Sequence, residues 1–206
     1  MNEHIFKESV QALNMLIEGN RLYIESFQNP SHISQQKRHD TTRDGQKPYA
    51  AILACSDSRV PPEHIFSAGI GDLFVVRTAG NVVGTFELGS IEFAVQYLDV
   101  RLIIILGHNH CGAVTAALEG QADGYISSIV HEIKLGLGGA TTESDAISNN
   151  ITHSKERILQ SATVREWIDY GELMVLGAIY DVQTGYVDFW HENKRKYEAE
   201  LDHNHH

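Results

Sequence analysis

Two apolar runs, residues 49–54 and 102–106, constrain the fold of this chain more than any other feature. Both are nearly free of polar residues, as in strands of a parallel sheet that is covered on both faces. Cys55 directly follows the first run, and Gly107 and His108 follow the second. Because open α/β sheets usually carry their sites at the carboxyl ends of strands, we expect Cys55 and His108 to lie in one site.

The remaining patterns alternate between strands and helices. We expect further strands over residues 73–76, 173–180 and 186–190, the last as an antiparallel edge strand. Helices are expected over residues 4–27, 63–68, 87–98, 111–119, 125–137 and 149–168, whereas the polar stretch 28–45 is expected to contain a turn. The predicted fold class is α/β, with a mainly parallel central β-sheet flanked by helices, an N-terminal helical arm and that edge strand.

The length of 206 residues fits a single domain, residues 1–206. We divide it into a helical arm (1–45), an α/β core (46–190) and a charged tail (191–206). The arm has an apolar face that can pack on its own domain or on a second subunit. A net charge of −11 argues against nucleic acid and anionic membranes as partners. Without an apolar run that could span a bilayer or serve as a secretory leader, we expect a cytoplasmic protein.

The chain has two cysteines, Cys55 and Cys111. They could form a disulfide, but in a reducing compartment cysteines grouped with histidine more often bind metal or act in catalysis. With His108 they supply two thiolates and an imidazole, a suitable set for one zinc ion. His110 is a rival ligand. We favour His108 because a spacing of three residues from Cys111 suits one ion better than adjacency does.

Asp57 and Arg59 follow Cys55 at intervals of two residues. In extended backbone, such spacing points all three side chains to one face. A carboxylate beside an arginine could then control the fourth coordination position of the metal.

The motifs CSDSRV at 55–60 and GHxxCGA at 107–113 resemble those of the β-class carbonic anhydrases. The similarity extends from about residue 45 through 113 and resumes at 177–181. It implies a zinc lyase, a carbonate dehydratase, that reversibly hydrates carbon dioxide to bicarbonate and a proton through a zinc-bound hydroxide. One zinc ion per chain would be held permanently by Cys55, His108 and Cys111. Asp57 would either complete the coordination or pair with Arg59, gating and orienting the nucleophile.

The resemblance also implies a substrate pocket for carbon dioxide and bicarbonate, built from Gln46, Phe74, Phe93 and Gly112. Phe93 replaces the tyrosine common in the family, and for both phenylalanines plain core packing is the alternative. Family members are homodimers or tetramers built from dimers, with pocket residues contributed across the interface.

Members regulated by bicarbonate carry a tryptophan three residues before the first zinc cysteine, where this chain has Ile52. Arg77 and Tyr180 match other parts of that regulatory pocket. Without the indole, we expect no such regulation and an open site near neutral pH. His64, His110 and His131 are equal candidates for a proton relay.

Three alternatives remain. The same side chains could close permanently round zinc in a structural or sensory protein. The alternating strands and helices could bind a dinucleotide, but no GxGxxG follows a predicted strand. Zinc hydrolases that act on carbonyl sulfide or carbon disulfide share these ligands, and only pocket shape would distinguish them.

Overall fold

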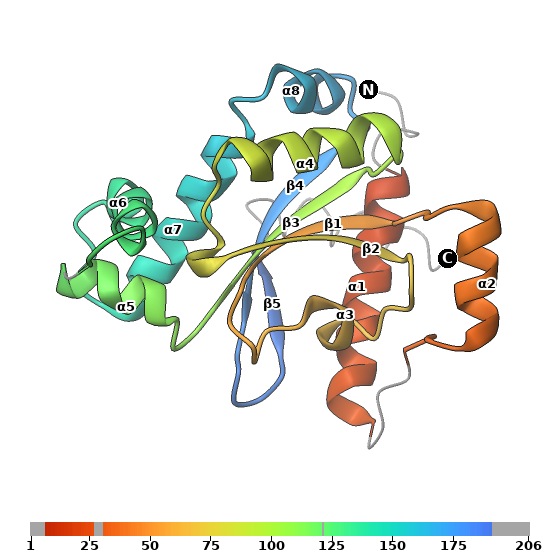
Figure 1. Cartoon of the computed structure of the whole chain (residues 1–206), viewed down its shortest axis with the longest axis horizontal. Helices are drawn as coiled ribbons and strands as arrows, with labels where there is room; N and C mark the ends of the chain where they lie inside the picture. The colour runs from red at the N-terminus through yellow and green to blue at the C-terminus, as the bar shows by residue number, and fades with distance from the viewer. Residues whose placement is uncertain (1–6, 27–30, 121, 191–206) are drawn as a thin grey trace, which may run out of the picture.

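The computed structural model describes residues 7–26, 31–120 and 122–190. Its centre is a five-stranded sheet in the order β2-β1-β3-β4-β5 (Figure 1). The first four strands are mutually parallel, and β5 pairs antiparallel with β4. The strands are β1 (Ala50–Cys55), β2 (Leu73–Thr78), β3 (Leu102–His108), β4 (Met174–Tyr180) and β5 (Val187–Trp190). The predicted α/β class, the parallel sheet and the antiparallel edge strand are confirmed.

The helices largely follow the expected ranges. They are α1 (Lys7–Glu25), α2 (Gln35–Asp44), α3 (Pro62–Ile65), the 3-10 turn η1 (Ala79–Asn81), α4 (Thr85–Tyr97), α5 (Gly112–Glu119), α6 (Ile126–Gly136), α7 (Glu143–Ile158) and α8 (Ala162–Asp169). The prediction of one helix over 149–168 is wrong. A helix starts earlier, at the Thr142 cap, and a second begins after Ser161, whose hydroxyl accepts a hydrogen bond from the Val164 amide at 3.1 Å.

Helix α2 was not expected, because residues 35–44 carry no apolar stripe. None of its residues is buried. The helix begins at Ser34, whose hydroxyl accepts a hydrogen bond from the Lys37 amide, and the Lys37 ammonium pairs with Asp72 at 2.9 Å. A cap and one ion pair thus hold a helix that hydrophobic periodicity could not reveal.

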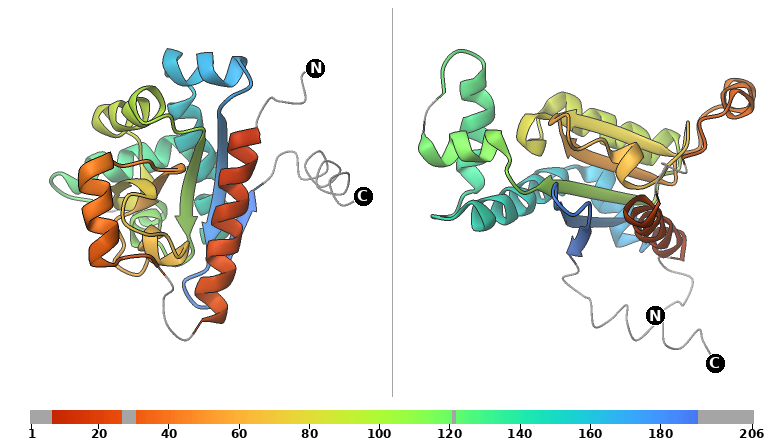
Figure 2. Two further views of the ribbon diagram at one scale, coloured as in Figure 1. Left: turned by 90° about the vertical axis from the view of Figure 1, so that its right-hand side faces the viewer. Right: turned by 90° about the horizontal axis from the view of Figure 1, so that it is seen from below.

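The sheet is buried on both faces, so alternate residues of each strand enter two different cores. Ala51, Leu53, Ile103 and Ile105 pack with residues of α4, α5, α6, α7 and α8. Ala50, Ile52, Leu102, Ile104 and Leu106 pack with α1 and α3. Figure 2 shows α1 along one face of the sheet, opposite the larger group of helices. This double cover explains why β1 and β3 have continuous apolar sequences.

Helix α1 packs on its own domain, one of the two possibilities that the sequence left open. Asn20, buried at the contact, donates to the carbonyls of Ile65 (3.2 Å) and Gly185 (2.9 Å). Its side-chain oxygen accepts from the Val187 amide at 2.9 Å. The amide therefore joins α1 to the end of α3 and to β5 with every bond satisfied except one lone pair.

The division into arm, core and tail stays a prediction, since residues 1–6, 27–30 and the whole predicted tail lie outside the described residues. Within the described ranges, no helix combines the length and apolar character needed to cross a bilayer.

The close contact between Gly19 of α1 and the backbone of Phe66 predicts that one added methyl group destabilises the fold. A Cβ at Gly19 would lie 1.9 Å from the backbone oxygen of Phe66, so Gly19→Ala must displace α1. We expect the free energy of unfolding to fall by about 1–3 kcal/mol, as in overpacked cores. Gly89→Ala in α4 is the control, because nothing lies within 4 Å of its Cβ, and it should raise stability by about 0.5–1 kcal/mol. Urea unfolding measures both, and equal effects would contradict this packing.

Candidate metal centre

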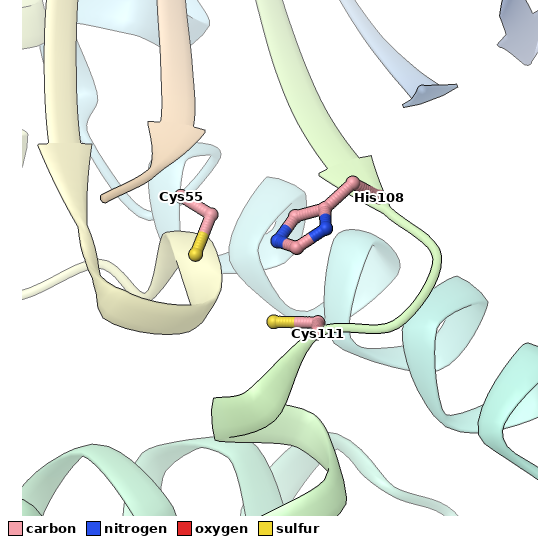
Figure 3. Close-up of side chains that lie close together, drawn as sticks. All are labelled: Cys55, His108 and Cys111. Atoms are coloured by element: carbon pink, nitrogen blue, oxygen red, sulfur yellow. The ribbon is translucent and has the colours of Figure 1, made fainter. Parts of the chain in front are cut away.

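The parallel pairing of β1 with β3 brings the two predicted metal-binding stretches together. Ala54 pairs with Leu106, so Cys55 at the end of β1 and His108 at the end of β3 lie at the same edge of the sheet. Cys111 precedes α5 after a short turn. The ligand atoms of the three residues all lie within 4.8 Å of one another, and Figure 3 shows their side chains converging. The expectation of one shared site is confirmed.

The rival histidine points elsewhere. The side chain of His110 is 63% exposed, and its Nδ1 lies 3.8 Å from a carboxylate oxygen of Glu143. Its backbone has a positive φ of 54°, so the chain turns sharply between His108 and Cys111. This turn directs His108 and Cys111 to the cluster and His110 away from it.

The hydrogen bonding of His108 leaves one ring nitrogen available to a metal. His108 is 1% exposed, and its Nδ1 lies 2.8 Å from the carbonyl oxygen of Asn109. A carbonyl only accepts, so Nδ1 carries a hydrogen, and in the neutral ring Nε2 then carries a lone pair. Among the described residues, this buried Nε2 has no hydrogen-bond partner. An imidazole that donates one N–H to a carbonyl and offers the other nitrogen is the usual arrangement of a zinc-binding histidine.

Cys55 and Cys111 are buried and not bonded to each other. The sulfur of Cys55 accepts hydrogen bonds from the amides of Gly80 (3.2 Å) and Asp57 (3.4 Å). The hydrogen bond from Cys111 is the main cause that lowers the pKa of Cys55 well below its usual value, and it outweighs burial. The same contact, with burial, raises the pKa of Cys111. Zinc binds cysteine as the thiolate, so metal binding would release the proton that the two sulfurs share.

This donor set fits zinc. Two thiolates and one neutral imidazole are typical zinc ligands, and the thiolates balance the charge of the ion. The buried, unpartnered Nε2 of His108 also indicates a metal site. A buried lone pair without a partner lowers the stability of the fold unless a ligand binds to it.

Asp57 and Arg59 meet in a turn. The expectation of extended backbone through Arg59 is wrong, because β1 ends at Cys55 and the Val60 amide donates to the Asp57 carbonyl at 3.0 Å. The guanidinium nevertheless holds both carboxylate oxygens of Asp57, Nη2 to Oδ2 at 2.7 Å and Nε to Oδ1 at 3.0 Å. Oδ1 also accepts from the Arg59 amide at 2.9 Å. These bonds from Arg59 lower the pKa of Asp57 to about 2, against the effect of burial.

Two arginines brace this turn against the rest of the site. Arg59 also donates to the carbonyl of His110 at 2.9 Å. Arg77 donates to the carbonyls of Cys55 (3.0 Å) and Asp57 (2.7 Å). From the sequence, Arg77 was assigned only to a regulatory pocket. Its hydrogen bonds to these backbone carbonyls could not be predicted, because every residue carries such a carbonyl.

Comparison with known proteins places the chain in a family. The carbonic anhydrase family profile matches residues 50–187. Carbonic anhydrase 2 of Mycobacterium tuberculosis is 40% identical over 188 residues, which cover 85% of this chain and 90% of that protein. The chain belongs to the β-class carbonic anhydrases. The reaction of this family is the zinc-dependent hydration of carbon dioxide.

Solved structures agree with this assignment. The structure of the β-carbonic anhydrase CcaA superposes with a TM-score of 0.69 at 27% identity and covers 87% of this chain and 95% of its own. A structure described as one of two tetrameric β-carbonic anhydrases from Sordaria macrospora superposes with a TM-score of 0.66 at 25% identity. It covers 89% of this chain and 95% of its own.

Within one chain of this carbonic anhydrase, three of the four predicted pocket residues lie away from the cluster. Gly112 lies beside it, since it follows Cys111 at the start of α5. Gln46 precedes β1, whereas Cys55 ends it. Phe74 pairs with Ala51, four residues before Cys55, which is about 13 Å along the strand.

The second predicted pocket phenylalanine lies at the same distant end. Phe93 on α4 is 45% exposed, and its ring centroid is 6.3 Å from that of Phe74 and 5.2 Å from that of Tyr97. Phe93 is exposed, whereas Phe74 is half-buried and packs against the core on the helix-rich face of the sheet, so core packing accounts for Phe74 only.

The two histidines provide a direct test of the metal centre. We expect His108→Ala to weaken zinc binding by at least about 100-fold, since the loss of a ligand should exceed the effect of an outer partner. His110→Ala should bind zinc like the unsubstituted protein, because its ring points away from the cluster. Chelator competition and metal analysis measure the difference, with circular dichroism as the check of folding. Equal zinc binding by the two variants would contradict the ligand set.

Proposed function

We propose that this chain catalyses the reversible hydration of carbon dioxide to bicarbonate and a proton at a zinc ion held by Cys55, His108 and Cys111. The observation that carries the proposal is the buried cluster of these three donors, with the unpartnered Nε2 of His108 inside it, in a member of this family. When bound, zinc lowers the pKa of water and so makes a nucleophile available near neutral pH.

Asp57 would accept a hydrogen bond from that nucleophile and orient it. A carboxylate has about four acceptor positions, and three N–H groups of Arg59 occupy three of them. The remaining position is on Oδ2, which accepts only one of these bonds. A pKa of about 2 keeps Asp57 ionised throughout the neutral and alkaline range, so this acceptor is permanent.

Arg59 would keep Asp57 off the metal. An Asp57 that coordinates zinc must give up its paired contacts with the guanidinium, which favours an open fourth position. The same pairing argues against the permanently closed structural site, for which the carboxylate would have to join the three-residue cluster. Ile52, in place of the tryptophan of regulated members, supports the open form near neutral pH.

Gln46, Phe74 and Phe93 would act on a neighbouring subunit. They lie towards the amino end of β1, away from the cluster of their own chain. A homodimer, or a tetramer built from dimers, would let one copy supply these side chains to the metal centre of the other. The tetrameric description of the related Sordaria macrospora structure supports such an assembly. We place the protein in the cytoplasm, where reducing conditions would keep both thiols free for zinc.

Stopped-flow hydration of carbon dioxide by zinc-loaded protein tests the proposed reaction. Turnover should rise from neutral to alkaline pH, as the nucleophile forms by loss of a proton. Asp57→Ala and Arg59→Ala should each lower kcat/KM by about 10–100-fold with zinc still bound. Arg59→Lys is the matched variant, since it keeps the charge and loses the two-point contact. Full turnover in Asp57→Ala would refute its role, and a zinc-loaded protein inactive at every pH would refute the function.

Mixed oligomers test whether the pocket is shared. Gln46→Ala and His108→Ala should each impair every site of their own homo-oligomers. When the two are co-expressed, a chain with the Gln46→Ala substitution keeps its metal and receives Gln46 from its partner, so part of the turnover should return. The control pair, Cys55→Ala with His108→Ala, damages the same site in each chain and should recover nothing. No recovery in the first pair would show that Gln46 acts on its own chain or not at all.

A further inference from the structure

One of the hydrogen bonds to the sulfur of Cys55 comes from a turn with unusual backbone angles. The Gly80 amide that donates to Cys55 lies in η1, where Gly80 and Asn81 both have positive φ, 66° and 45°. For Asn81 this conformation costs free energy, and for Gly80 it is one of many that a glycine can adopt. The turn therefore needs outside support to hold its N–H on the sulfur.

Helix α7 supplies that support through two buried side chains. Asn150 donates from Nδ2 to the Gly80 carbonyl at 2.8 Å, and Ser154 donates to the Asn81 carbonyl at 3.0 Å. Both are 1% exposed and, four residues apart, share one face of the helix. Consecutive carbonyls of η1 are thus anchored to one rigid element, which restricts the rotation of the Gly80 backbone.

Side chains of α5 and α6 also pack tightly against Gly80. A Cβ at Gly80 would lie 2.7 Å from Cδ1 of Ile133 and 3.1 Å from Cβ of Ala113. No other residue fits there, so the conformation must be maintained with glycine and its full freedom. The hydrogen bonds from α7 are the directional part of that restraint.

Asn150 lowers the stability of the fold in this position. The rest of the buried face of α7 is largely apolar, with Ile147, Ile151 and Ile158. Among the described residues, the Oδ1 of Asn150 has no hydrogen-bond partner. A buried amide with one unsatisfied end destabilises the fold relative to a well-packed apolar side chain, so its value lies in what Nδ2 holds.

We propose that Asn150 and Ser154 are positioning residues of the metal centre, which hold the Gly80 N–H on Cys55 and so set how strongly this sulfur binds the metal and donates charge to it. The inference rests on the zinc site of the proposed function. A hydrogen bond to a thiolate draws electron density from the sulfur, which leaves the metal more electrophilic and keeps the thiolate in place.

Cobalt-substituted protein reports on this bond without any assay of turnover. In Asn150→Ala, loss of the Gly80 hydrogen bond makes the thiolate easier to oxidise, so the sulfur-to-cobalt charge-transfer absorption should move to longer wavelength. Zinc affinity, from chelator competition, should fall by about 10–100-fold. Ser154→Ala should shift both in the same direction by less, since it frees only the neighbouring carbonyl.

Asn149→Ala is the matched control. Asn149 lies next in the same helix and also donates to a backbone carbonyl, but this carbonyl is that of Leu137 after α6, at 2.8 Å, and not one of η1. Its charge-transfer absorption and zinc affinity should equal those of the unsubstituted protein. If folded Asn150→Ala and Ser154→Ala match this control in both measurements, the proposal is overturned. Should Asn150→Ala fail to fold, Ser154→Ala decides alone. Failure of the unsubstituted protein to bind either metal would instead overturn the zinc site itself.

Discussion

The parallel pairing of β1 with β3 is the constraint on which the site depends. It places Cys55 at the same sheet edge as His108, although the two are 53 positions apart in the chain. Both strands carry apolar side chains on both faces, so this pairing is stable only where helices shield both faces from water. Helix α1 on one face and the α4–α8 group on the other therefore contribute to the metal centre without containing a ligand.

The three residues of the cluster and Asp57 differ in what fixes their positions. Cys55 and His108 end buried strands, and Cys111 lies at the start of a helix, so their positions follow from the packed core. Asp57 lies in a turn and is held by Arg59, whose side chain is 51% exposed. An exposed ion pair contributes little to stability by itself. The three donors of the cluster are thus fixed by the packed core, whereas Asp57 depends for its position on a partner exposed to solvent.

Much of this could be read from the sequence, because it depends on local patterns. Continuous apolar runs indicated β1 and β3, and the spacing between His108 and Cys111 favoured His108, the histidine that lies in the cluster. The missed features depend on partners distant in sequence. Helix α2 has no apolar stripe, and its anchor is a single ion pair with Asp72. The break between α7 and α8 depends on the Ser161 cap inside an otherwise helical pattern.

The site was predicted better in its ligands than in its surroundings, and the reason is physical. Ligand chemistry requires particular side chains, whereas bracing by Arg77 and positioning of Gly80 use backbone groups that every residue carries. Gln46 presents the opposite case. Its identity and the strand that separates it from Cys55 were both visible in the sequence, but the residue pattern does not show which subunit's cluster Gln46 would face.

Because Gln46 and the cluster lie at opposite ends of β1, metal binding and turnover have different structural requirements. The three donors of the cluster converge within a single chain, so zinc binding there would need only a folded subunit. The proposed substrate contacts from Gln46, Phe74 and Phe93 need a second copy, since the length of β1 keeps them from the cluster of their own chain. Metal affinity and turnover would then respond to different perturbations. Disruption of the core around β3 should affect both, whereas separation of the subunits should abolish turnover and leave the metal in place.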